Sequence, residues 1–400
     1  MGAVTPAKAL TAAAPAPGTA AAAALVIGPS PASPSTARAI NDRLALRLLQ
    51  DEGPLTATQL KKLTGLSRPS VADLVERLTE AGLIEVVGES GEQRRGPNAR
   101  LYGIVARRAY LAALDVRTDS ATAVVTDLLG KPVAEAALPV DAVEEAVDRL
   151  EELAREAGAD RLHTVVIGAP GLVSPGSGQL GDTTRLPGWH RDLVAALRRR
   201  LPATVVVENE TNLAALAEQR VGAARDVDSF VLLWLGAGVG AAVVLDGRLR
   251  RGASGGAGEI GFLPVPGTGA LPSATDCSGG FHALAGRTAV IALAAGHGYH
   301  GPVEEAVAGA AGEPFLEALA ERLSLGAAAV TAVLDPGCVV LGGELGRAGG
   351  PGLAARVAAR LATLTPVPTE VRATALGGPA ILAGARLAAR EAAQADLFAP

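Results

Sequence analysis

Carboxylates and amides gather in two short stretches of the chain whose other residues are small or apolar. The first reads Glu208-Asn209-Glu210-Thr211-Asn212 and follows an apolar run, and the second places Glu259 after a glycine-rich segment, 252–258. Glycines at this density allow backbone N–H groups to approach a ligand, because no Cβ stands in the way. Another glycine-rich turn, 236–240, has the form of a phosphate loop. These residue types predict a polar small-molecule site beside a candidate phosphate site.

Alternating strands and helices must position these residues. From Tyr110 onward, apolar runs of strand length alternate with helical segments, and polar residues follow the carboxyl ends of the strands. Open α/β sheets build their ligand sites at these strand ends. Two such units follow one another between 110 and 400, which predicts an α/β fold in two lobes.

Residues 36–105 differ in character and predict a winged helix-turn-helix. Three helical segments precede two candidate strands, and capping-box spacing from Thr56 to Gln59 marks the start of the second helix. The third helix, 68–81, follows Ser67, a residue type that caps helix N-termini. Three helices followed by a β-hairpin are typical of this DNA-binding fold.

The third helix of such a domain enters the major groove of DNA, and the wing contacts phosphates or the minor groove. The expected DNA-binding residues are Ser67, Arg68, Ser70 and Asp73 on the helix and Arg94, Arg95 and Arg100 on the wing. The segment has 10 Lys and Arg against 9 Asp and Glu, so a winged helix that binds a protein stays an alternative. The basic residues gather at the wing, which favours double-stranded DNA as the partner.

Composition narrows the class of protein further. The formal net charge is −5 over 400 residues, so any contact with nucleic acid must come from a local basic patch. Cys277 and Cys338 lie far apart, which argues against a disulfide framework and suits a reducing cytoplasm. Residues 1–35 are rich in Ala and Pro and are interpreted as a disordered tail or a misplaced start, in preference to a signal peptide. No later segment is long and apolar enough to span a membrane, and we expect a cytoplasmic protein.

Six motifs occur behind the winged helix in an order that identifies a family. They are 168–171 (GAPG), 186–189 (LPGW), 208–218 (ENETNLAALAE), 235–240 (LGAGVG), 255–261 (GGAGEIG) and 335–343 (DPGCVVLGG). With the N-terminal segment, the chain resembles the ROK family of sugar-responsive repressors and sugar kinases. The resemblance implies a two-lobed actin/hexokinase-like (ribonuclease H-like) domain over 106–400.

The resemblance also implies a small carbohydrate as the effector. The sugar-binding residues that it implies are Asn209, Glu210, Glu259, Gly171 and Trp189. Two alternatives stay open for Trp189, which either flanks the sugar or caps an edge of the core. Glu259 is the strongest candidate, since its glycine neighbours form a loop in which packing requires no charge.

Departures from the family's kinases predict that phosphoryl transfer is lost. The kinases wrap ATP phosphate with an Asp-x-Gly-Gly-Thr turn, whereas this chain has Asp115-Val116-Arg117-Thr118-Asp119, and Ala237 replaces the usual Thr of the second phosphate loop. Glu210 stands where the kinases have an Asp as general base, and its extra methylene moves the carboxylate away from the sugar hydroxyl. A Glu still accepts hydrogen bonds from a sugar, so sugar binding is expected to survive.

The family's zinc site also lacks its ligands. Phe262 occupies the position of the family's histidine, and the three cysteine positions fall on Ser273, Thr275 and Gly280. A structural zinc needs four such ligands. We therefore expect no metal and no other cofactor.

The sequence as a whole predicts a sugar-responsive transcriptional repressor that acts as a homodimer or a dimer of dimers on a DNA operator. Its kinase-like domain is expected to sense a carbohydrate without phosphorylating it. One alternative is an active ROK sugar kinase with an appended DNA-binding module. Another is a DNA-binding protein whose second domain has lost its ligands and serves dimerisation alone.

Overall fold

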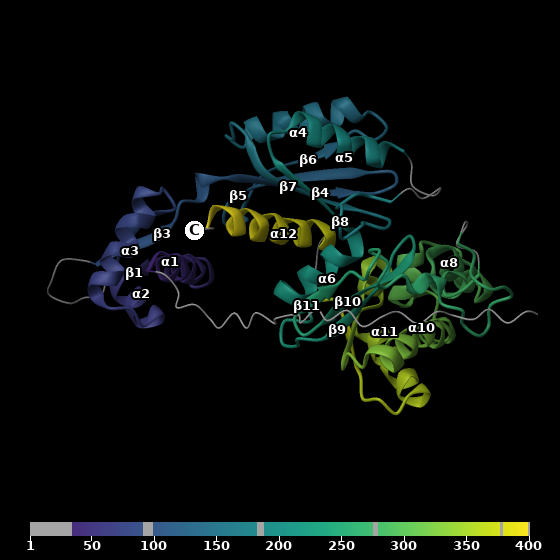
Figure 1. Ribbon diagram of the computed structural model, residues 1–400. Helices are drawn as coiled ribbons and strands as arrows, with labels where there is room; N and C mark the ends of the chain where they lie inside the picture. The colour runs from purple at the N-terminus through teal and green to yellow at the C-terminus, as the bar shows by residue number, and fades with distance from the viewer. Residues whose placement is uncertain (1–33, 91–98, 182–187, 275–278, 377–378, 399–400) are drawn as a thin grey trace, which may run out of the picture.

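The computed structural model describes residues 34–90, 99–181, 188–274, 279–376 and 379–398. It contains three sheets, one in an N-terminal domain and one in each of two lobes (Figure 1). Arg94 and Arg95 of the predicted wing, and Thr275 and Cys277, lie outside the described residues.

The N-terminal domain is the predicted winged helix. It consists of α1 (Pro34–Asp51), β1 (Leu55–Thr56), α2 (Ala57–Thr64), α3 (Arg68–Glu80), β2 (Ile84–Ser90) and β3 (Ala99–Ile104), with sheet order β1-β3-β2. The capping box is formed, since Thr56 Oγ1 accepts from Gln59 N and the Gln59 side chain accepts from Thr56 N. Ser67 caps α3, and Gly82 follows that helix with a φ of 65°. Local sequence signals therefore set the bounds of both helices.

The first lobe contains a five-stranded sheet of order β6-β5-β4-β7-β8. Its strands are β4 (Tyr110–Val116), β5 (Ala121–Asp127), β6 (Pro132–Leu138), β7 (Leu162–Ala169) and β8 (Thr204–Asn209). The sequence analysis missed β6, an edge strand of Ala, Glu and Val whose side chains are mostly solvent-accessible, so it lacks an apolar run. Helices α4 (Val143–Glu156) and α5 (Trp189–Arg200) cover the face of this sheet opposite α12 (Figure 1).

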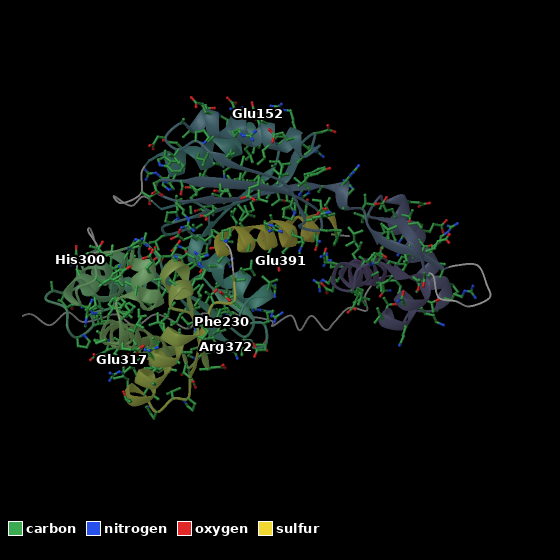
Figure 2. The ribbon with its side chains drawn as sticks, turned by 180° about the vertical axis from the view of Figure 1, so that it is seen from behind. Glu152, Phe230, His300, Glu317, Arg372 and Glu391 are labelled. Atoms are coloured by element: carbon green, nitrogen blue, oxygen red, sulfur yellow. The ribbon has the colours of Figure 1, made fainter. Side chains whose placement is uncertain are left out.

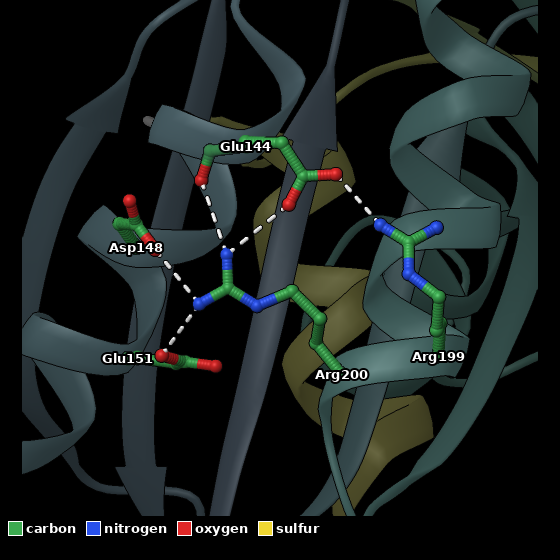
Figure 3. A network of polar contacts seen from close by, with 5 residues as sticks. All are labelled: Glu144, Asp148, Glu151, Arg199 and Arg200. Atoms are coloured by element: carbon green, nitrogen blue, oxygen red, sulfur yellow. Dashed lines mark hydrogen bonds and ion pairs between the residues drawn. The ribbon is translucent and has the colours of Figure 1, made fainter.

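An ion-pair network joins α4 and α5 on the outside of the first lobe (Figure 3). Arg200 contacts Asp148 at 2.7 Å and Glu151 at 2.9 Å. Glu144 accepts from Arg200 at 3.3 Å and from Arg199 at 2.6 Å. All five residues belong to one lobe, so this network stabilises the packing of two helices and not the relation between lobes.

The second lobe repeats the topology of the first. Its sheet has the order β11-β10-β9-β12-β13, with β9 antiparallel to β10 and parallel to β12, as β4 is antiparallel to β5 and parallel to β7. The strands are β9 (Phe230–Leu235), β10 (Val239–Leu245), β11 (Arg248–Arg250), β12 (Cys338–Gly342) and β13 (Glu370–Ala373). The helices are α7 (His282–Ala285), α8 (Arg287–Gly296), α9 (Val303–Glu305), α10 (Glu313–Leu334) and α11 (Gly343–Leu364). This repeated sheet confirms the predicted two-lobed, ribonuclease H-like fold.

Two helices, α6 (Glu210–Val221) and α12 (Ala380–Leu397), pack against each other between the lobes (Figure 1). Their backbones are so close that a Cβ on Gly384 would lie 1.8 Å from Leu213 O. Arg220 of α6 pairs with Glu391 of α12 at 3.0 Å, and Figure 2 shows Glu391 between the lobes, while Arg372 and Phe230 lie in the second lobe. Arg372 on β13 in turn contacts Asp226 at 2.6 Å, which fixes the segment after α6 to the second sheet. The α6–α12 pair is thus anchored to both lobes.

Candidate ligand site and nucleic-acid interface

The start of α3 presents the predicted DNA-reading residues to solvent. Ser67, Arg68 and Ser70 are all exposed. Ser67 Oγ accepts from Ser70 N at 3.3 Å and lies 2.8 Å from Ser70 Oγ, so the two hydroxyls rigidify the first turn. Asp73 is also exposed, but its carboxylate pairs with Arg77 on the same helix. Three of the four predicted side chains of α3 are therefore available to base edges, while Asp73 is held by its own helix.

The opposite face of α3 fastens the reading helix to the rest of its domain. Val71, Leu74 and Leu78 are buried in the apolar core. Arg77 Nε donates to Asp42 Oδ2 of α1 at 3.3 Å, and its terminal nitrogen pairs with the same carboxylate. The contact between Arg77 and Asp42 therefore joins α3 to α1.

Two lysines near the reading helix were not identified from the sequence. Lys61 and Lys62 occupy the last turn of α2 and are exposed, one short turn before Arg68. They add two exposed cations to the segment that leads into the reading helix, and exposed cations suit phosphate contacts. The two adjacent lysines at the end of the second helix were the sequence signal that could have identified this phosphate contact.

Most of the hydrogen-bonding capacity of the Asn209 side chain is used within the protein. Asn209 is the N-cap of α6, whose first residue is Glu210, whereas the sequence analysis expected the helix to begin at Leu213. Asn209 Oδ1 accepts from Thr211 N at 2.8 Å and from Asn212 N at 3.3 Å, and Nδ2 donates to Gly171 O at 2.9 Å. An amide group has a second N–H, which is the part of Asn209 left for a ligand. Asn209 and Gly171, distant in sequence, are thus brought together.

Glu210 lies in the first turn of α6 beside a group of charged residues. The protein mass around it and the negative charge of Asp115 raise the pKa of Glu210 to about 7, against the opposing charge of Arg117. Glu344 raises it further. Near neutral pH, Glu210 therefore exists both as an acid that donates and as a carboxylate that accepts a hydrogen bond.

A second carboxylate of the cleft holds the two lobes together. Glu208, at the end of β8, is buried and accepts from Asn212 Nδ2 at 2.9 Å. Its other oxygen, Oε2, forms an ion pair with Arg251 Nη2 of the second lobe at 2.6 Å. The adjoining glycine loop packs as closely, since a Cβ on Gly255 would lie 2.1 Å from Val173 O. The loop that contains Glu259 is therefore seated against the first lobe.

Glu259 points an uncompensated carboxylate toward solvent. Its side chain is exposed, yet desolvation by the surrounding protein raises its pKa. Among the described residues, no hydrogen bond or ion pair of this carboxylate is present. Glu259 is thus the best placed of the predicted sugar ligands.

Trp189 lies in the core of the first lobe. It is 7 % exposed, starts α5 and stacks on His190 with ring centroids 4.2 Å apart. Of the two alternatives for this residue, the structure favours a position at the edge of the core. A sugar would reach only a narrow edge of its indole ring.

Charged side chains occupy the other side of the cleft, where the family's kinases hold ATP phosphate. Arg117 Nε donates to Asp115 at 3.2 Å, and Nη1 donates to Glu344 of the second lobe at 2.5 Å. A cavity of about 260 Å³ remains beside Arg117, between Trp234 and Arg347. Arg117 and two carboxylates stand at a phosphate position, so the residues present do not fit ATP.

The residues at the family's zinc position form an apolar contact. Phe262 packs edge-on against His282, with ring centroids 5.4 Å apart. Phe281 N donates to Leu263 O at 2.9 Å and closes the base of the loop over 264–280. Within the described part of the chain, no three His, Cys, Asp or Glu side chains are grouped to hold a metal ion. These residues do not fit a structural zinc.

Comparisons with known proteins agree with this geometry. The ROK family model matches residues 111–392, and a MarR family model matches residues 36–96. An N-acetylglucosamine repressor of Escherichia coli O6:H1 is 29 % identical over 241 residues, which are 56 % of this chain and 57 % of that protein. The match therefore spans little more than half the length of this curated relative.

Two solved structures are similar in fold. A ROK family transcriptional regulator, described as a homologue of the E. coli MLC protein, gives a TM-score of 0.72 at 22 % identity over 90 % of this chain and 98 % of that one. A ROK family glucokinase from Streptomyces griseus, in complex with glucose and AMPPNP, gives 0.58 at 25 % identity over 71 % and 100 %. No helix in the described ranges has the length and apolar character needed to cross a membrane.

Proposed function

The chain belongs to the ROK family, and from that premise we propose that it is a transcriptional repressor whose two-lobed domain senses a small carbohydrate without phosphorylating it. One observation carries the proposal: the exposed reading helix α3 and helix α6, which begins with Glu210, share one continuous apolar core, while Arg117 and Glu344 fill the position expected for phosphate. The relative that is named an N-acetylglucosamine repressor supports the same function.

The DNA contact is made by the winged helix. Arg68 and Ser70 at the start of α3 read base edges, and Lys61 and Lys62 contact phosphates. The chain acts as a homodimer, because two winged helices are needed to read two half-sites about one helical turn apart. A dimer of dimers would extend the same contact to two operators. A cytoplasmic location is part of the same proposal, since the operator is chromosomal DNA.

The effector binds between the lobes through Glu259, Glu210 and the remaining N–H of Asn209. These groups offer both acceptors and donors, as the hydroxyls of a sugar require. Phosphoryl transfer is absent because Arg117 and Glu344 meet at the phosphate position. The carbohydrate is therefore a ligand and not a substrate.

Helix α12 relays the state of the cleft to the DNA-binding domain. It begins at Ala380, which lines the cavity beside Arg117, and it packs on α6 along its length. At its far end, Gln394 Nε2 donates to Gln50 Oε1 of α1 at 2.7 Å and to Leu128 O at 3.3 Å. Figure 1 shows this end of α12 directed toward the winged helix. A sugar that favours one lobe arrangement thus shifts α1 and, through Arg77, α3.

Fluorescence anisotropy with a duplex from the region upstream of the gene tests the proposal. Apo protein is expected to bind at nanomolar concentration, and one of N-acetylglucosamine, glucose, mannose or xylose to weaken binding at least tenfold. Arg68→Ala should weaken specific binding by roughly 1 to 3 kcal/mol without changing sugar affinity in calorimetry. Tight DNA binding that no sugar alters, together with no calorimetric binding of any sugar, would refute the sensing role.

Two controls separate related functions. Coupled assay of ADP release with each sugar should show no turnover, and a sugar-dependent rate would indicate an active kinase with an appended DNA-binding module. Gln394→Ala should keep both ligands but weaken the effect of one on the other, because the hydrogen bond from α12 to Gln50 of α1 is lost. If sugar still weakened DNA binding by Gln394→Ala as much as by the wild type, the hydrogen bond between Gln394 and Gln50 would not carry the signal.

A further inference from the structure

Arg117 stands out among the charged residues of the cleft because it bridges the two lobes. Its guanidinium pairs with Asp115 on β4 of the first lobe at 3.2 Å and with Glu344 on α11 of the second at 2.5 Å. The family's kinases carry glycine at this position, whose lack of a side chain leaves room for phosphate. The arginine side chain takes up the room for phosphate and introduces a positive charge that can pair with carboxylates of both lobes.

The contacts of Arg117 are distributed unequally between the lobes. Its backbone N donates to Ser120 O at 2.8 Å, and its carbonyl accepts from His190 Nε2 at 3.1 Å. His190 is 1 % exposed and stacks on Trp189 in the first-lobe core. The first lobe therefore holds Arg117 by its backbone and by Asp115, whereas Glu344 joins it to the second lobe. Separation of the lobes would break the pair with Glu344 and leave the other contacts intact.

Charge also favours this arrangement. Asp115 is 6 % exposed, and Oδ1 is buried without a hydrogen-bond partner among the described residues, so burial raises its pKa while Arg117 opposes that rise. Glu344 lies in the first turn of α11, where the helix dipole also favours a carboxylate. Arg117 thus compensates one buried and one half-buried carboxylate at once, and it keeps a fixed orientation toward the second lobe.

We propose that Arg117 is a latch that holds the lobes closed by its pair with Glu344, so that closure of the cleft needs no nucleotide. Arg251 and Glu208 form a second pair across the lobes at 2.6 Å. The latch deepens the proposed sensing function, since its strength sets the balance between open and closed lobes that a carbohydrate then shifts toward closure. Opening of the latch is the step that a change in lobe arrangement requires.

Three variants and a matched control test the latch in the full-length protein without any ligand. Glu344→Gln removes the charge but leaves Asp115 paired, Arg117→Met removes the cation, and the double variant combines them. Arg199→Met is the control, because Arg199 pairs with Glu144 inside the first lobe (Figure 3). The measurements are the radius of gyration from small-angle X-ray scattering and hydrogen exchange at the amides of 117–120 and 343–347.

Glu344→Gln is expected to increase the radius of gyration and to speed exchange of these amides about two- to fivefold, as befits a half-exposed ion pair. The double variant should open no further than Arg117→Met, because both changes break one contact. Arg199→Met should match the wild type. Unchanged scattering and exchange in both Glu344→Gln and Arg117→Met would overturn the latch.

A second arm connects the latch to the effector. Calorimetry with the same four sugars should show about two- to fivefold weaker binding to Glu344→Gln, since a smaller fraction of the protein is closed. Equal sugar affinity in wild type and Glu344→Gln would show that the pair does not govern the binding-competent state, and would overturn the link to sensing. If no sugar binds the wild type, the sensing function fails while the ligand-free measurements still decide the latch.

Discussion

Glu210→Gln tests whether this carboxyl is held in an environment that disfavours its charge. Glu210 lies in the first turn of α6, beside Asp115 and Glu344, and its pKa rises from 4.5 to about 7. Because the folded pKa lies above the unfolded one, the folded state holds the proton more tightly between these values, and stability falls as the pH rises through them. At about 1.4 kcal/mol per pH unit, the loss amounts to at most about 3 kcal/mol by pH 8. A glutamine keeps the shape and stays neutral, so it should remove this loss.

Urea denaturation at about pH 5 and about pH 8 measures the effect. The chain has two tryptophans, and Trp189 reports on the first lobe while Trp234 reports on the second. Glu210→Gln should be close to the wild type at the lower pH and more stable by up to about 3 kcal/mol at the higher one. The control is Glu321→Gln, an exposed position in the middle of α10, which should shift neither value. Parallel pH dependence of wild type and Glu210→Gln would show that burial and the neighbouring carboxylates do not raise the pKa of Glu210.

Three further changes address the glycine loop and the DNA-binding domain. Gly258→Ala should destabilise the second lobe by roughly 3 kcal/mol in thermal unfolding and weaken sugar binding, because φ is 90° and a Cβ would lie 1.9 Å from Ala241 O. The control is Gly267→Ala, where φ is 85° but the space around the Cβ is open, and which should cost about 1 kcal/mol. Equal losses of stability in the two variants would contradict the steric clash at Gly258. Thr56→Ala removes the capping box of α2 and should cost about 1 kcal/mol in the urea transition of the winged helix, with no loss implying that the cap is dispensable. Arg68→Ala should weaken operator binding by roughly 1 to 3 kcal/mol in anisotropy titrations, and an unchanged affinity would remove Arg68 from the interface.

Local signals were sufficient where a residue acts on its immediate neighbours. The capping box at Thr56, the cap at Ser67 and the glycine that ends α3 are interactions over two to four residues, and they set the winged helix as expected. They failed at β6, which lies at an edge and buries little, and at the start of α6, where the cap is Asn209. An Asn that caps a helix and a loop Asn that binds a ligand look the same in a sequence.

The cleft shows a different limit. In the sequence, Arg117 stands where the family's kinases have a glycine, and this replacement predicted weak ATP binding. It did not indicate where the guanidinium would go, because its partner Glu344 lies 227 residues away on the other lobe. The pair of Arg251 and Glu208 was not predicted either, because the two residues are 43 positions apart in the sequence. Trp189 was left between two positions until the core of the first lobe placed it.

The sequence by itself determined the kinds of element and their order: a winged helix, then two α/β units, with carboxylates at strand ends and glycines where a backbone must come close. These properties depend on periodicity, caps and residue size, which act within a few residues. Only the tertiary structure decided which charges meet. A pair such as Arg117 and Glu344 forms because two repeated sheets are packed around α6 and α12, and the strength of the pair depends on distance and burial in the folded chain.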